Sequence, residues 1–131
     1  MKSQDYANYR NKFFADISDM SDLKRIEYTV GNQDDDVFTN FRSIGDRLGI
    51  DPKIVLSIYL LKHMDSIRSY LKHGQTFTED ISGRIADAIN YLVLLNGLIE
   101  VEKEDNHKRK SDNKNLVGTK RTEIGQVVNG K

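Results

Sequence analysis

Hydrophobic residues recur along much of the chain at intervals of three and four positions, which is the spacing of amphipathic helices. Residues 51–73, DPKIVLSIYLLKHMDSIRSYLKH, are apolar over more than one face. Asp51 is a residue type that caps helices, Pro52 is tolerated at the first helical position, and Gly74 is expected to end the helix. We therefore predict a central helix over residues 51–73. Because one chain of 131 residues has little else to cover so wide an apolar surface, we also expect a homo-oligomer.

A second helix is predicted over residues 81–99 as the packing partner of the central one. Thr78 is expected to cap it, with Glu79 and Asp80 in its first turn, where acidic side chains favour the helix dipole. The helix is expected to fray after Val101. One apolar stripe runs through it at steps of three or four residues, formed by Ile81, Ile85, Ile89, Leu92, Leu95 and Ile99.

The N-terminal segment predicts a first helix over residues 3–17, with Ser3 as its N-cap and most of its aromatic residues on one face. A polar break is expected over residues 18–21. The next stretch, DLKRIEYTV over residues 22–30, fits either one more short helix or an extended connector. This segment therefore leaves two alternatives open.

A turn is expected at residues 31–36, GNQDDD, because glycine permits positive φ and the Asn and Asp side chains bond nearby backbone amides. Residues 37–48 follow as an amphipathic helix, and Gly49 is its expected C-cap. The stripe of this helix consists of Val37, Phe38, Phe41, Ile44 and Leu48.

Together these elements predict an all-α fold, a bundle of four to five helices in a single domain over residues 1–103. Residues 104–131 are expected to form a polar, basic C-terminal tail, either disordered or arranged as a docking hairpin. The basic run HKRK at residues 107–110 could contact phosphates, but a short cluster in a polar terminus is usually solvated.

Composition narrows the function classes. The chain has 20 Lys and Arg against 20 Asp and Glu, so no overall positive field favours nucleic acid or an anionic membrane as a partner. It has no cysteine, which excludes disulfides and zinc-thiolate sites. No signal-peptide pattern or spanning apolar run is present, so we expect a cytoplasmic protein.

Polar residues on the two long predicted helices suggest a small-molecule site. Asp65 and Asp87 are candidate ligands for Mg²⁺, which prefers a few hard oxygen ligands. Lys62 and Arg84 are candidates for holding phosphate oxygens. The alternative is that these residues form ordinary intrahelical pairs on a solvated surface, because Arg84 lies three positions before Asp87.

Three blocks carry a resemblance to a known family: DVFTNFRSIGDRLGID, VLSIYLLKHMDSI and ISGRIADAINYLVLLNGLI. They span about half of the chain. This region resembles small all-α proteins of bacteriophages and prophages that are related to MazG-like nucleotide pyrophosphohydrolases and nucleotide-modification-associated domains. The family pattern matches an Asn-aromatic pair at Asn40 and Phe41, a lysine at Lys62, and a D-x-x-x-Y element at Asp87 and Tyr91.

The resemblance implies an oligomeric helical fold with a nucleotide between helices and, in active members, Mg²⁺ held by acidic residues. Active members carry ExxE and ExxD motifs that gather carboxylates on the metal. This chain has no ExxE, and Arg84 stands where the second motif has an acid three positions before Asp87.

The favoured hypothesis is a protein that binds a nucleotide or nucleotide-derived phosphate compound without hydrolysis and sequesters this signal in a phage context, as in counter-defence. The first alternative is a Mg²⁺-dependent nucleoside triphosphate pyrophosphohydrolase, and the second is a structural or protein-interaction oligomer. Aromatic residues, Tyr59 among them, are expected to stack on a base. The candidate ligand-binding residues are Lys62, Arg84, Asp87, Tyr91, Asn90, Asp65, His63, Arg68, Phe38, Asn40, Phe41 and Arg42.

Overall fold

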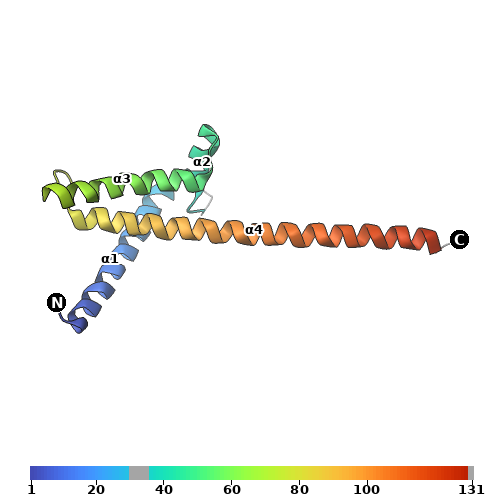
Figure 1. Cartoon of the computed structure of the whole chain (residues 1–131), viewed down its shortest axis with the longest axis horizontal. Helices are drawn as coiled ribbons and strands as arrows, with labels where there is room; N and C mark the ends of the chain where they lie inside the picture. The colour runs from blue at the N-terminus through green and yellow to red at the C-terminus, as the bar shows by residue number, and fades with distance from the viewer. Residues whose placement is uncertain (30–35, 130–131) are drawn as a thin grey trace. The chain divides into compact units, whose positions relative to one another are not determined.

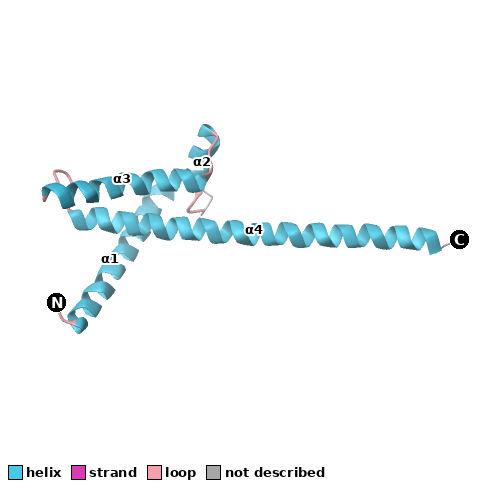
Figure 2. Ribbon diagram, in the orientation of Figure 1, coloured by secondary structure: helices cyan, strands magenta, loops and turns pink. Residues whose placement is uncertain are grey.

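The computed structural model describes residues 1–29 and 36–129, with side chains for residues 1–27 and 36–118. All regular structure in these ranges is helical, with no strand, which confirms the all-α prediction (Figure 2). The predicted turn at residues 31–36 lies outside the described residues except for Asp36. The helices are α1 (Ser3–Thr29), α2 (Thr39–Leu48), α3 (Pro52–His73) and α4 (Ile81–Asn129).

The chain divides into two compact units, Met1–Asn96 and Gly97–Lys131, which we call the N-terminal and C-terminal units. The N-terminal unit holds α1, α2, α3 and the beginning of α4. Within it, α3 and the first part of α4 run side by side in opposite directions, joined through Gly74 and the link that follows (Figure 1). No helix in the described part of the chain is long and apolar enough to cross a membrane.

Helix α4 continues to Asn129, so the prediction that it frays after Val101 is wrong, and residues 104–129 form neither a hairpin nor a disordered tail. The single proline of the chain is Pro52, and therefore none interrupts α4. Charged side chains also pair along this helix, as Lys103 Nζ does with Glu100 Oε1 at 2.7 Å. The independence of residues 1–103 as a domain stays a prediction.

Helix α1 also runs further than the sequence indicated. The expected break at residues 18–21 is absent, and residues 22–29 continue the helix instead of forming a connector. One face of α1 stays covered by the rest of the N-terminal unit through this polar stretch, because Ile17 is buried and Ser21 and Lys24 are half-buried. The Tyr6 amide donates to the Lys2 carbonyl oxygen at 2.9 Å, so Lys2 and not Ser3 occupies the N-cap.

The ends of α2 and α3 follow their sequence signals closely. Gly49 and Gly74 adopt positive φ values of 67° and 75° at the helix C-termini, as predicted. The Asp51 side chain accepts a hydrogen bond from the Lys53 amide at 2.8 Å, which confirms the predicted cap of α3. Helix α2 begins at Thr39 and not at residue 37, with Phe38 at the N-cap.

The start of α4 differs from the prediction. The Asp80 carbonyl accepts from the Gly83 and Arg84 amides at 3.0 and 3.3 Å, so Asp80, not Thr78, precedes the first turn. Thr78 Oγ1 instead accepts from Arg84 Nη2 at 3.3 Å. The hydroxyl of Thr78 is therefore used to hold the Arg84 side chain beside the link.

Helix α3 is less buried than its composition suggests. Val55 and Leu56 are its buried residues, whereas Ile54, Ile58 and Leu61 are exposed by half or more. These three lie four and three positions apart and thus form one apolar stripe, which we call the α3 stripe. The buried hydrophobic side chains of the N-terminal unit are Ile17, Phe38, Val55, Leu56, Ala86 and Ala88.

Candidate functional site

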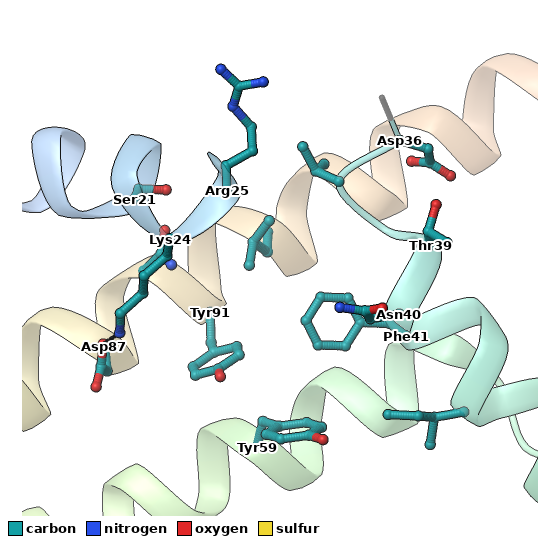
Figure 3. Close-up of a pocket in the computed structure, with 14 residues that line it drawn as sticks. Ser21, Lys24, Arg25, Asp36, Thr39, Asn40, Phe41, Tyr59, Asp87 and Tyr91 are labelled. Atoms are coloured by element: carbon teal, nitrogen blue, oxygen red, sulfur yellow. Dashed lines mark hydrogen bonds and ion pairs between the residues drawn. The ribbon is translucent and has the colours of Figure 1, made fainter. Parts of the chain in front are cut away.

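A cavity of about 220 Å³ lies within the N-terminal unit, where all four helices contribute side chains (Figure 3). Aromatic and aliphatic side chains form part of its wall, and polar and charged side chains form the rest. The lining residues are Ser21, Lys24 and Arg25 of α1, Asp36 and Val37, Thr39, Asn40, Phe41 and Ile44 of α2, Tyr59 of α3, and Asp87, Asn90, Tyr91 and Leu94 of α4.

The aromatic wall brings together three helices. The rings of Tyr59 and Tyr91 are stacked, with centroids 5.7 Å apart and an interplanar angle of 18°. Phe41 meets both edge-on, at 5.9 Å from Tyr59 and 6.4 Å from Tyr91. On the outer side of the pair, His63 stacks on Tyr91 at 5.3 Å. These offset and edge-on arrangements are the favourable ones for aromatic rings, so the cluster is a well-defined flat surface.

The polar wall contains an ion pair between Lys24 and Asp87, which connects α1 to α4. Lys24 Nζ lies 2.6 Å from Asp87 Oδ1, a short charge-assisted hydrogen bond. The Asp87 side chain is 8% exposed and that of Lys24 is 40% exposed. A carboxylate buried to this degree is costly without a cationic partner. Lys24 therefore compensates Asp87 and still reaches solvent.

His63 lies beside this pair without completing it. Its Nδ1 atom is 3.8 Å from Asp87 Oδ2, too far for a hydrogen bond, and has no hydrogen-bond partner among the described residues. Burial lowers the pKa of His63, and Arg84 and Lys24 lower it further, while Asp87 and Glu79 oppose the shift. His63 is consequently neutral near pH 7.

Amide and hydroxyl groups complete the polar wall. Asn40 and Asn90 line the cavity from α2 and α4, and each offers both donors and an acceptor. Asp36 forms an ion pair with Arg42, whose guanidinium lies over the Phe38 ring at 5.7 Å. This contact fixes the beginning of α2, because Asp36 Oδ1 also accepts from the Phe38 amide at 3.0 Å. Asp36 therefore holds Arg42 and the first turn of α2 in place and also lines the cavity.

The structure places part of the predicted site in this cavity. The predicted residues that line it are Asn40, Phe41, Asp87, Asn90 and Tyr91, with Tyr59 as expected for stacking.

Three further predicted residues lie next to the cavity, since His63 stacks on Tyr91 and Arg42 binds Asp36 above Phe38. The other predicted residues are not part of its lining. Lys62 is exposed on α3. Asp65 and Arg68 are also exposed, with Arg68 Nη1 3.9 Å from Asp65 Oδ1.

Arg84 also belongs to a separate contact. Its Nε atom lies 3.2 Å from Glu79 Oε2, and its Nη2 donates to Thr78. The predicted phosphate-binding cations Lys62 and Arg84 therefore do not line the cavity.

The proposed metal ligands Asp65 and Asp87 have different surroundings. Asp87 is buried against Lys24, whereas Asp65 is exposed beside Arg68. Among the side chains described, those of residues 1–27 and 36–118, no group of three or more His, Cys, Asp and Glu is placed to hold a metal ion. A role for Mg²⁺ stays a prediction.

Sequence reasoning missed the contribution of α1, namely Ser21, Lys24 and Arg25. These residues fell in the segment interpreted as a break followed by an uncertain connector. The signal was nevertheless present, because Ile17, Ser21 and Lys24 continue one helical face at steps of four and three. If polar residues are accepted on an inward-facing helical stripe, the spacing predicts that Lys24 faces the protein interior.

Comparison of the chain with protein-family models, curated proteins and solved structures finds no match. The resemblance to MazG-like and nucleotide-modification-associated proteins accordingly stays a prediction from the residues quoted above.

Proposed function

We propose that the N-terminal unit binds a nucleotide or nucleotide-derived small molecule in the cavity and retains it without hydrolysis. The observation that carries this proposal is the convergence of stacked rings, two amide side chains and a half-exposed lysine on one cavity. Rings of Phe41, Tyr59 and Tyr91 provide an apolar surface for a flat base. Asn40 and Asn90 can hydrogen-bond its polar edge.

The volume of the cavity supports binding of the base end of the ligand. At about 220 Å³ it is smaller than the roughly 300–1,000 Å³ of typical ligand sites, so a whole nucleotide does not fit inside. The base and part of the sugar would occupy it, with phosphate at its margin. Lys24 is 40% exposed at that margin and supplies the positive charge.

Retention is favoured over hydrolysis because both carboxylates of the cavity are already paired. Asp36 binds Arg42 and Asp87 binds Lys24. Neither is free to take up Mg²⁺ or activate a water unless its ion pair opens. Binding alone changes no covalent bond, and the proposed role is therefore to sequester the ligand.

The test combines mass spectrometry with calorimetry. Purified protein is incubated with Mg²⁺ and a mixture of nucleosides, nucleotides, cyclic dinucleotides and NAD, and the bound and free fractions are analysed. An intact compound released from the protein by heat supports retention. Release of pyrophosphate from a triphosphate would replace the proposal with the pyrophosphohydrolase, and recovery of no compound would refute binding.

Two exposed asparagines of the N-terminal unit provide a matched comparison for the recovered compound. Asn40 lines the cavity, whereas Asn96 does not. Asn40→Ala is expected to weaken binding about tenfold, the effect of losing roughly 1.4 kcal/mol of hydrogen bonding, and Asn96→Ala is expected to leave affinity unchanged. Equal affinities for both variants would place the ligand elsewhere.

We further propose that a second copy of the chain packs on the α3 stripe. Ile54, Ile58 and Leu61 expose more than half of their surface on one helical face. The formal net charge of zero gives two copies no long-range repulsion. Light scattering after size exclusion should find a dimer or larger assembly, and a monomer at all concentrations would contradict this.

A further inference from the structure

Asp87 has a different neighbour at each of its two oxygen atoms. Oδ1 lies 2.6 Å from Lys24 Nζ, and Oδ2 faces His63 Nδ1 at 3.8 Å. The first contact is a full ion pair. The second joins a buried carboxylate to an imidazole nitrogen with no hydrogen-bond partner among the described residues. The carboxylate thus has one cationic partner and, beside it, one that becomes cationic on gaining a proton.

Lys24 is the member of this group that can leave. Its side chain is 40% exposed, against 8% for Asp87 and 12% for His63. It lines the cavity and extends from α1 toward Asp87 past Tyr91 (Figure 3). An anion at the margin of the cavity can therefore compete with Asp87 for the same ammonium group. His63, held between α3 and the Tyr91 ring, stays next to Asp87 when Lys24 turns away.

We propose that the phosphate of the ligand takes Lys24 from Asp87, and that His63 then takes up a proton from solvent and replaces Lys24 as the cationic partner of Asp87. The inference rests on the proposed function and deepens it, since it assigns the anionic group of the ligand to Lys24. Neutral imidazole gains one proton to become imidazolium, and its Nδ1–H donates to Asp87 Oδ2.

The charges around His63 support this exchange. Asp87 and Glu79 favour the protonated ring, whereas Arg84, Lys24 and burial disfavour it. Movement of Lys24 onto a phosphate removes one opposing charge and leaves Asp87 uncompensated. Arg84 stays engaged by Glu79 at 3.2 Å, so its effect does not change. Both changes raise the affinity of His63 for a proton.

The exchange is tested in the ligand-free full chain by replacing Lys24 with the isosteric but uncharged methionine. The ring protons of the three histidines are followed by NMR from pH 4.5 to pH 8.5, with exposed His73 and His107 as internal references. Lys24→Met is expected to raise the pKa of His63 above its wild-type value and leave both references unchanged. Asp87→Asn added to Lys24→Met is expected to reverse the rise.

An unchanged pKa of His63 in Lys24→Met overturns the inference, because His63 then does not respond to the loss of the cation that pairs with Asp87. Lys24→Gln gives the same comparison if the methionine variant does not fold. The ligand step uses adenosine 5′-monophosphate as the probe, titrated calorimetrically at pH 7.5 in two buffers of different ionisation enthalpy. Binding with proton uptake that disappears in His63→Gln supports the exchange, whereas binding without uptake overturns it.

The two proposals fail in different ways. Absence of binding by any nucleotide refutes the proposed function, while the histidine titration of Lys24→Met still decides whether Asp87 can change partners. Nucleotide binding combined with an unchanged His63 pKa leaves the proposed function standing and removes the exchange.

Discussion

Removing the two ends of the Lys24–Asp87 ion pair should have unequal effects on stability. Lys24→Met leaves a carboxylate that is only 8% exposed without its cation. Removing one partner of a fully buried ion pair costs roughly 3–5 kcal/mol of unfolding free energy. Because this pair is partly exposed at Lys24 and His63 lies beside Asp87, we expect a loss at the lower end, about 3 kcal/mol. Asp87→Asn keeps the shape of the side chain and leaves an ammonium that is 40% exposed and can be hydrated, so about 1 kcal/mol is expected.

Urea unfolding measured by tyrosine fluorescence is a suitable assay, because the chain has no tryptophan and Tyr59 and Tyr91 lie in the N-terminal unit. At pH 7.5 the free energy of unfolding should fall more in Lys24→Met than in Asp87→Asn. At pH 5.5 the deficit of Lys24→Met relative to wild type should shrink, since His63 can then carry the compensating charge. Equal losses, or a larger loss in Asp87→Asn, would refute the assignment of Asp87 as the buried member.

Three further outcomes are expected. Leu56→Ala should lower the free energy of unfolding by about 3 kcal/mol, because Leu56 is 1% exposed, and Leu71→Ala, at 77% exposure and outside the α3 stripe, should change it by less than about 1 kcal/mol; similar losses would contradict the burial pattern. Asp51→Ala should cost about 1 kcal/mol through loss of the Lys53 amide bond; no loss at pH 7 would rule out the cap. It should also reduce the acid-sensitive part of stability, because the Lys53 side chain and, after it, the Lys53 amide lower the pKa of Asp51. Because burial lowers the pKa of His63, the unfolded chain takes up its proton more readily, so stability should fall as pH drops below about 6.5, and less so in His63→Gln; an identical pH dependence would contradict this.

The sequence was most informative where local chemistry decides the structure. Asp51 and Pro52 fix the start of α3, and Gly49 and Gly74 fix two helix ends, because each acts through its own backbone geometry. The aromatic residues of the site could also be predicted, because Tyr59 and Tyr91 lie on long helices with a clear hydrophobic periodicity. Local signals of this kind do not depend on where the rest of the chain lies.

The charged part of the site could not be predicted in the same way. The helical face that continues from Ile17 marks Lys24 as facing inward but does not name its partner, and only tertiary packing places Lys24 against Asp87 and leaves Lys62 exposed. The polar residues 18–21 also concealed the continuity of α1. Helix α4 extends beyond the last residue of its apolar stripe, because Lys and Glu favour helix formation even where no face of the helix is buried.

The most direct test of the central claim is the location of a bound nucleotide in the unmodified protein. In ¹H–¹⁵N spectra recorded while adenosine 5′-monophosphate is added, the side-chain amides of Asn40 and Asn90 and the backbone amide of Tyr91 should shift together and saturate. The amides of Lys62 and Asp65 should stay in place. Shifts confined to Lys62 and Asp65, or no shift at all, would contradict a nucleotide site in this cavity.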